Sequence, residues 1–278
     1  MKYLQELWSS RELLWNLASR EVRGQYKRTI FGQLWSLANP LVLMVIYTFI
    51  FGFIFKSNPP PGNPSGLDIF ALWLLCGLLP WTFLANVVNA SASSLVANAG
   101  LIQKVSFSRA VLPLSQVGSN AYNWAFEMAV LLIAVSVVGG FVLPWLPLLL
   151  VGMFLLAVFA SGLGLLFAVA NVYFRDTQYL LSIALQMWMY LTPIIYPMRL
   201  VRTESDKWGG IFGTPVTVAE IYNLNPMVHF VELFRALIYD NRFPSGANWM
   251  ICIGWAVVTL VVGFAVFRRN ERKLAEIL

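Results

Sequence analysis

A run of fifteen uncharged residues, 41–55, follows a segment that carries four basic side chains. These are Arg20, Arg23, Lys27 and Arg28. The apolar segment 33–55 would cover about 34 Å as a helix, enough to cross the hydrocarbon core of a bilayer with some tilt. Basic residues beside a span favour the cytoplasmic side, so this boundary predicts an N-terminus inside and a first span that runs outward.

The composition supports an integral membrane protein. Of the 278 residues, 59% are hydrophobic and 12% are charged, and the charged share is roughly half that of a typical soluble domain. A net charge of +6 could indicate nucleic-acid binding, but the basic residues cluster at the ends of apolar segments, where membrane topology accounts for them. Cys76 and Cys252 both lie in apolar runs, which gives no support to a disulfide framework.

Length and lack of charge predict an all-α membrane protein with six transmembrane helices. The predicted spans are 33–55, 69–92, 113–138, 145–172, 178–198 and 248–267, followed by a cytoplasmic tail, 268–278. With this topology, 13 of the 19 Lys and Arg residues fall inside and 6 fall outside. The charge distribution therefore predicts that both termini are cytoplasmic.

The first 32 residues are predicted to form an amphipathic helix at the membrane interface. Apolar side chains recur there at spacings of three and four, while Ser9 and Glu12 fit a capping box. The apolar positions are Leu4, Leu7, Trp8, Leu14, Trp15, Ala18 and Val22. The tryptophans favour an interfacial helix over one that packs on a soluble partner, although the pattern alone leaves both open.

The segment between the fifth and sixth spans, 199–247, is too long to be a plain connection. Asn225-Pro226 provides a cap and a first-turn proline for a helix with an apolar face. About 15 residues do not cross a bilayer, so we expect a re-entrant or interfacial gate helix on the outer side. The fifth span itself closes with the broken sequence Thr-Pro-Ile-Ile-Tyr-Pro at 192–197.

Motifs for catalysis are weak. His229 precedes Glu232 by one turn, but no HExxH sequence or second histidine accompanies them, so a structural polar pair is the simpler interpretation. No GxxxxGK[ST] phosphate loop occurs, and we expect no cofactor or metal in this chain. Glu127 is the one acid well inside a predicted span; an intramembrane carboxylate is a functional candidate, although a structural role is equally open.

Two predicted cytoplasmic loops carry features of docking elements. Residues 98–113 hold a short helical piece between Gly100 and Pro113, and residues 173–176 read Tyr-Phe-Arg-Asp. Short elements that combine an aromatic and a charge can dock into a groove on a soluble partner. The simpler alternative is that Lys104 and Arg109 act only as topology signals.

Several motifs, taken together, resemble the permease subunits of bacterial polysaccharide ABC exporters. They are YKRTIFGQLW at 26–35 with Asn39-Pro40, LIQKVSFSR at 101–109 with Leu112-Pro113, YFRD at 173–176, TPIIYP at 192–197, and Asn225-Pro226-Met227 with Arg235. The likeness to these ABC-2-type permeases, which export O-antigen, capsule or teichoic acid, covers nearly the whole chain in the right order. Ser108 departs from the pattern, because the family often has proline there.

The resemblance implies a homodimer in the cytoplasmic (inner) membrane with two ATPase subunits beneath it, which hold ATP and Mg. It implies a substrate polymer attached to undecaprenyl diphosphate, a coupling helix between spans two and three, and outer gate helices between spans five and six. We expect the loop 98–112 to carry the force of ATP hydrolysis, helped by residues 174–176 of the second loop. The residues expected to couple to the ATPase are Leu101, Lys104, Phe107, Arg109, Phe174, Arg175 and Asp176.

Two further sites are expected. The basic residues Arg20, Arg23, Lys27 and Arg28 would contact the lipid diphosphate. The outer gate would include Tyr196, Asn225, Phe230 and Phe234. Two other functions compete with this assignment: an ion-coupled transporter or channel, which would need ionisable groups such as Glu127 in its spans, and a membrane-bound enzyme based on His229 and Glu232.

Overall fold

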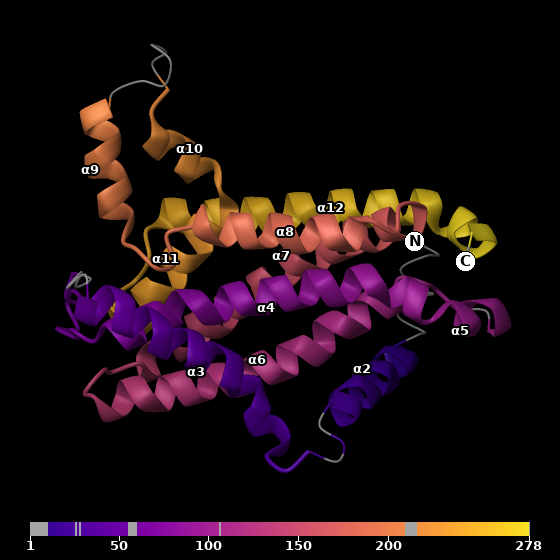
Figure 1. Cartoon of the computed structure of the whole chain (residues 1–278), viewed down its shortest axis with the longest axis horizontal. Helices are drawn as coiled ribbons and strands as arrows, with labels where there is room; N and C mark the ends of the chain where they lie inside the picture. The colour runs from indigo at the N-terminus through magenta and orange to yellow at the C-terminus, as the bar shows by residue number, and fades with distance from the viewer. Residues whose placement is uncertain are drawn as a thin grey trace.

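The computed structural model describes residues 11–25, 27, 29–54, 60–105, 107–208 and 216–277, and these residues form an all-helical bundle without strands (Figure 1). Three short segments accompany the α-helices: 3-10 turns at Gly32–Leu34 and Leu143–Trp145 and a π-helical segment at Thr48–Ile54. The α-helices are α2 (Arg11–Gln25), α3 (Trp35–Tyr47), α4 (Phe70–Ala97), α5 (Ala99–Lys104), α6 (Val111–Val137), α7 (Leu146–Tyr173), α8 (Thr177–Tyr190), α9 (Met198–Trp208), α10 (Val218–Leu224), α11 (Pro226–Ile238) and α12 (Gly246–Ile277).

Among the described residues, five helical segments are long and apolar enough to cross a membrane. They lie over the predicted spans one to four and six, and are Gly32–Ile54, Phe70–Ala97, Val111–Val137, Leu143–Tyr173 and Gly246–Glu271. Each has a mean hydropathy of 1.3 or more over its most apolar part. The uncharged runs that mark spans in the sequence are thus helices in the structure.

The predicted fifth span, 178–198, differs from the structure. Its helix, α8, has 14 residues and stops at Tyr190, after which turns occupy most of 191–196. At 1.5 Å per residue α8 is about 21 Å long, shorter than the ~30 Å hydrocarbon core. The helix stops here because Pro193 has no N–H to donate and disfavours helical backbone at Thr192.

The predicted cytoplasmic tail, 268–278, is a continuation of the last membrane helix over its described residues. The helix α12 continues through these positions to Ile277, where the described part of the chain ends. Leu274 is fully buried in an apolar cluster with Leu17 of α2 and Ile102 of α5. Burial of this face explains why the helix continues past the last uncharged residue.

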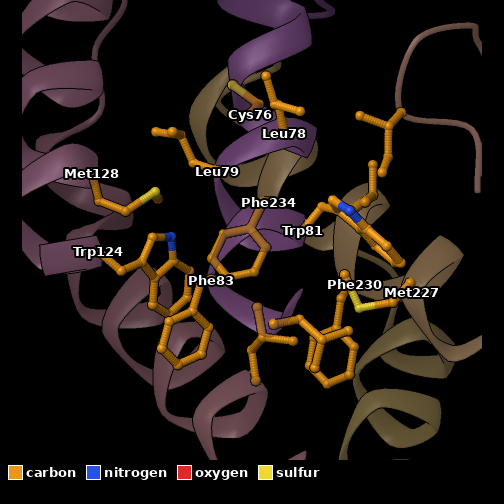
Figure 2. Packing of buried hydrophobic residues seen from close by; sticks show 14 of the residues in the cluster. Cys76, Leu78, Leu79, Trp81, Phe83, Trp124, Met128, Met227, Phe230 and Phe234 are labelled. Carbon is orange, nitrogen blue, oxygen red and sulfur yellow. The ribbon is translucent and has the colours of Figure 1, made fainter. Parts of the chain in front are cut away.

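The helix α4 is the centre of the main core. In its most apolar part 78% of residues are buried, compared with 6% for Gly32–Ile54. Phe83 of α4 stacks on Trp124 of α6 with ring centroids 4.2 Å apart, and the Trp124 ring meets Phe234 of α11 edge-on at 5.7 Å (Figure 2). Offset and edge-on aromatic pairs add to the stabilisation from burial, so three helices are joined at this point.

Helices α7 and α12 pack backbone against backbone. A Cβ atom added at Gly162 of α7 would overlap the backbone of Thr259, and one added at Gly263 of α12 would overlap the carbonyl of Gly162. Small residues allow such close approach between helices in membranes, where dispersion contacts replace the hydrophobic effect as the driving force. These two glycines therefore fix the distance between α7 and α12.

We expect Gly162→Ala to destabilise the protein by about 1–3 kcal/mol, because the added methyl group must push α12 away. Thermal unfolding of the purified protein in detergent, followed by loss of monodispersity, measures the effect. Gly254→Ala, also on α12, is the matched control, because a Cβ there meets nothing within 4 Å. Equal midpoints for the two variants would contradict the packing argument.

Candidate functional site

The bundle has two ends with different chemistry (Figure 1). One end, here called the α5 end, comprises residues 98–109, 173–177 and 268–277. The opposite end, the α9 end, comprises residues 191–208 and 216–226. Most of the coupling and diphosphate residues predicted from the sequence lie at or near the α5 end, and the predicted gate residues lie at or near the α9 end.

The residues predicted for coupling are only partly free at the surface. Leu101 and Phe107 are half-buried against an apolar cluster that includes Ile102 and Val111, whereas Lys104 is exposed. Packing within the chain therefore occupies part of the surface that we expected to meet a partner. In contrast, Phe174 is 73% exposed, and Arg175 and Asp176 beside it are exposed as well.

Arg109 is held within the chain. Its backbone N–H donates to Glu271 Oε1 at 2.9 Å, and its Nη1 donates to the backbone oxygen of Glu271 at 2.6 Å. The neighbouring loop is attached in the same way, because the Tyr173 hydroxyl donates to Asn270 Oδ1 at 3.0 Å. Sequence reasoning missed that the end of α12 joins both loops; the only available signal was a polar pair, Asn270-Glu271, within a basic tail.

The residues predicted to contact a lipid diphosphate are exposed where the structure describes them. Arg20 and Arg23 lie on α2 and Lys27 follows it, while Arg28 lies outside the described residues. Arg20 Nη2 donates to Asn98 Oδ1 at 3.3 Å, which connects α2 to the start of α5. The cationic side chains thus gather along α2, near the α5 end.

Only part of the predicted N-terminal helix, Arg11–Gln25, is described, and the Ser9 cap lies outside it. Leu17 and Ala18 are buried, and Ala18 lies close to Gly118 of α6. Trp15 is 72% exposed. The helix therefore packs one face on α6 and leaves an indole available to the surroundings.

At the α9 end, Asn225 connects three segments. Its Oδ1 accepts from Met227 N at 3.0 Å as the N-cap of α11, and from Trp188 Nε1 of α8 at 2.8 Å. Its Nδ2 donates to Thr192 Oγ1 at 3.0 Å. Tyr196, also predicted for the gate, donates to Tyr190 O at 2.6 Å and lies 3.1 Å from the Tyr222 hydroxyl of α10.

Phe230 and Phe234 do not line an opening, in contrast to the prediction for the gate. Both are fully buried, and Phe230 packs on Phe159 of α7 with ring centroids 5.5 Å apart. The helix α11 is buried on nearly all sides, with Glu232 as its one exposed residue, so both rings lie in the main core. The structure therefore assigns these two rings to packing.

Arg235 supports the broken end of α8, a role that sequence reasoning missed. Its Nη1 and Nη2 donate to the carbonyls of Pro193 and Ile194 at 2.7 and 2.6 Å. Its guanidinium carbon lies 3.5 Å from the centroid of the Trp73 ring of α4. The planar guanidinium of arginine suits two adjacent carbonyls and an aromatic face. The sequence feature that could have indicated this role is a single basic residue within an apolar helix.

His229 has structural partners rather than the expected one. Its Nδ1 lies 2.8 Å from Asn248 Oδ1 and its Nε2 lies 2.8 Å from the Asn223 carbonyl, whereas Glu232 is exposed. Asn248 Nδ2 also donates to the His229 carbonyl at 3.0 Å, so the pair joins α11 to α12. Among the described residues no three potential ligands gather to hold a metal ion.

Glu127 lines a polar cavity of about 440 Å³ between α2, α3, α4 and α6. Its walls hold seven amide side chains, namely Gln25, Asn39, Asn86, Asn89, Gln116, Asn120 and Asn123. Glu21 and Glu127 add carboxylates, and Trp35, Phe83 and Trp124 add aromatic surface. Among the described residues, no Lys or Arg lines it.

A second cavity, of about 340 Å³, adjoins the first at Glu127. Its other lining residues, from α3, α4, α6 and the positions next to them, are apolar. Glu127 is 6% exposed, and neither ion pair of the described chain, Lys207–Glu204 or Arg242–Asp240, involves it. The carboxyl group thus lies at the boundary between a polar and an apolar hollow.

These features define a polytopic membrane protein, with long apolar helices, a broken helix closed by side chains, and a polar cavity within the bundle. A profile of the ABC-2 type transporter family matches residues 12–239, and the chain belongs to this family. It is a permease and not an enzyme.

Several relatives match almost from end to end. The O-antigen export system permease protein RfbA of Myxococcus xanthus is 28% identical over 276 residues, 99% of each chain. The Polysialic acid transport protein KpsM of Escherichia coli is 26% identical over 262 residues, 92% of each chain. The capsule polysaccharide export inner-membrane protein CtrC of Neisseria meningitidis is 24% identical over 276 residues, 97% of this chain and 95% of that one.

We expect Arg235→Lys to destabilise the protein by about 1–3 kcal/mol, because an ammonium group cannot bond both carbonyls and leaves one partly buried acceptor unpaired. The midpoint of thermal unfolding in detergent measures the loss. Arg242→Lys is the matched control, because Arg242 forms an exposed ion pair with Asp240, and such pairs contribute little. A loss no greater than that of the control would contradict the role assigned to Arg235.

Proposed function

We propose that this chain is the membrane-spanning subunit of an ATP-driven exporter of polysaccharide linked to undecaprenyl diphosphate. The observation that carries the proposal is the end-to-end similarity to relatives named for export of O-antigen and capsule polysaccharide. The chain has no phosphate loop of its own, so the energy would come from a separate ATPase subunit. An O-antigen or a capsule polymer is the substrate class that these names support.

In this proposal two copies of the chain cross the inner membrane and two ATPase subunits bind the α5 end, which faces the cytoplasm. The positive-inside distribution of Lys and Arg supports this orientation. The helix α8 and residues 191–198 together would form the fifth of six crossings, with α9, α10 and α11 as gate elements on the outer side. The segment Gly32–Ile54 is only 6% buried within one chain, so this surface is free to contact a second copy in the proposed dimer.

The cationic side chains along α2 would receive the lipid diphosphate. Arg20, Arg23 and Lys27 are exposed, so they can offer charge-assisted hydrogen bonds to phosphate oxygens at the membrane interface. Replacement of these three and Arg28 by Gln should lower export in a correctly inserted protein. Unchanged export by that variant would show that these side chains do not bind the lipid diphosphate.

The orientation is tested by cysteine labelling of intact cells with a membrane-impermeant maleimide. Lys207→Cys and Asn241→Cys should react from outside, because both positions would lie beyond the outer surface, whereas Lys104→Cys should react only after lysis. Background labelling should be low, since both native cysteines, Cys76 and Cys252, are buried. If the cysteine introduced at position 241 reacts with the maleimide only after lysis, the six-span topology is wrong.

Export itself is tested by complementation. Cells that lack the chain should retain the lipid-linked polymer inside, and the wild-type gene should restore polymer at the surface. We expect Phe174→Ala to abolish export because this ring is the most exposed aromatic side chain of the α5 end, and a buried aromatic anchor in a partner's groove carries much of a docking energy. Purified complexes should still hydrolyse ATP, without transport.

Phe243→Ala is the matched control, since Phe243 is 56% exposed but lies between α11 and α12, outside the α5 end. Phe107→Ala should also abolish export. It should in addition lower thermal stability, because Phe107 packs on the apolar cluster that includes Ile102 and Val111. Normal surface polymer with stably expressed Phe174→Ala and Phe107→Ala would contradict the coupling surface. Surface polymer in cells without the chain would contradict the function.

A further inference from the structure

The polar cavity between α2, α3, α4 and α6 carries an inference that rests on the proposed function and goes beyond it. We propose that this cavity binds uncharged, hydroxyl-rich sugar units of the exported polymer near the α5 end. Its volume of about 440 Å³ lies in the range of small-molecule sites, roughly 300–1,000 Å³. The four lining elements place it beside α2, at the halves of α4 and α6 that lie nearer the α5 end.

Helix packing explains only part of the polar lining. Amide groups between membrane helices usually serve as interhelical hydrogen-bond partners. Here Asn89 Nδ2 instead donates to the Ala85 carbonyl at 3.0 Å and Asn120 Nδ2 to the Gln116 carbonyl at 2.8 Å, each within its own helix. These amides therefore do little to join helices, although a polar group in an apolar bundle costs free energy.

Two buried side chains on this wall, Asn123 and Trp124, each have one polar atom without a partner among the described residues. Asn123 is 9% exposed and gives its Nδ2 to Gln25 Oε1 at 2.9 Å, while its Oδ1 accepts no hydrogen bond. Trp124 is 2% exposed, and its Nε1 donates to no acceptor. An unpaired acceptor and an unpaired donor are both groups that a hydroxyl, which can donate and accept at once, is able to satisfy.

The charge of the lining decides between a sugar and the diphosphate carrier. Glu21 and Glu127 supply carboxylates, and no Lys or Arg of the described chain lines the cavity. Without a cation among these described residues the cavity offers a diphosphate no positively charged partner, whereas its carboxyl and amide groups can form hydrogen bonds with hydroxyl groups. Trp35, 53% exposed, adds an aromatic face, to which the apolar C–H face of a sugar ring can pack.

The test is protection of an introduced cysteine in the full-length protein in lipid nanodiscs. Asn120→Cys places a thiol in the cavity, and Thr203→Cys on α9 is the control. The probe is the oligosaccharide released by mild acid from the cell's own lipid-linked polymer, with inorganic pyrophosphate as the competing probe. We expect the oligosaccharide to slow maleimide labelling of Asn120→Cys and not of Thr203→Cys, and pyrophosphate to slow neither.

A second variant tests the hydrogen bonds. Asn86→Leu combined with Gln116→Leu keeps the side-chain volume but removes two amides, and should weaken protection of Asn120→Cys by about tenfold in oligosaccharide concentration. Should this variant fail to fold, the labelling of Asn120→Cys alone decides. Labelling unaffected by the oligosaccharide, or slowed only by pyrophosphate, would overturn the sugar site. The complementation of export is a separate measurement, so the sugar site can fail while the function stands.

Discussion

The carbonyl groups of the turns that follow α8 must find donors, because irregular backbone in an apolar environment is tolerated only when its polar groups are satisfied. Two residues supply these donors: Arg235 of α11 and Asn225, the N-cap of α11. Arg235 serves the carbonyls of Pro193 and Ile194, and Asn225 donates to the Leu191 carbonyl at 3.3 Å. The broken helix and α11 are thus one unit, and Trp73 ties that unit to α4 through the guanidinium.

The helices differ in how closely they are held. The pair α7 and α12 meets at glycine, and α4 is enclosed by its neighbours, so a shift of any of these helices would open voids or create overlaps. The segment Gly32–Ile54 has little buried surface and ends in a π-helical stretch, a feature often found at functional sites. The polar cavity lies between this loosely packed segment and the close-packed body, where small movements of α3 can change access to it.

Hydropathy and turn chemistry were sufficient to locate most of the fold. The uncharged runs and the Asn225-Pro226 cap are local signals, and the helices they predict are present. Long-range partners left no such signal: the Arg109–Glu271 contact joins residues 162 positions apart, and either side chain alone reads as a topology charge. The burial of Phe230 and Phe234 was missed for a related reason, since an apolar helix face fits a core as well as a gate.

The arrangement of charge provides separate places for the two parts of a lipid-linked glycan, the diphosphate and the sugar. Cations lie on the exposed side of α2, while the cavity behind that helix carries carboxylates and amides. Electrostatic attraction would hold a diphosphate at the surface, and the cavity, which no Lys or Arg of the described chain lines, would offer it no positively charged partner. The bond between Gln25 and Asn123 joins the end of α2 to the cavity wall, so a displacement of α2 by its charged ligand would alter the same wall that meets the sugar. Recognition of the two parts of one lipid-linked glycan would then be coupled through a single helix.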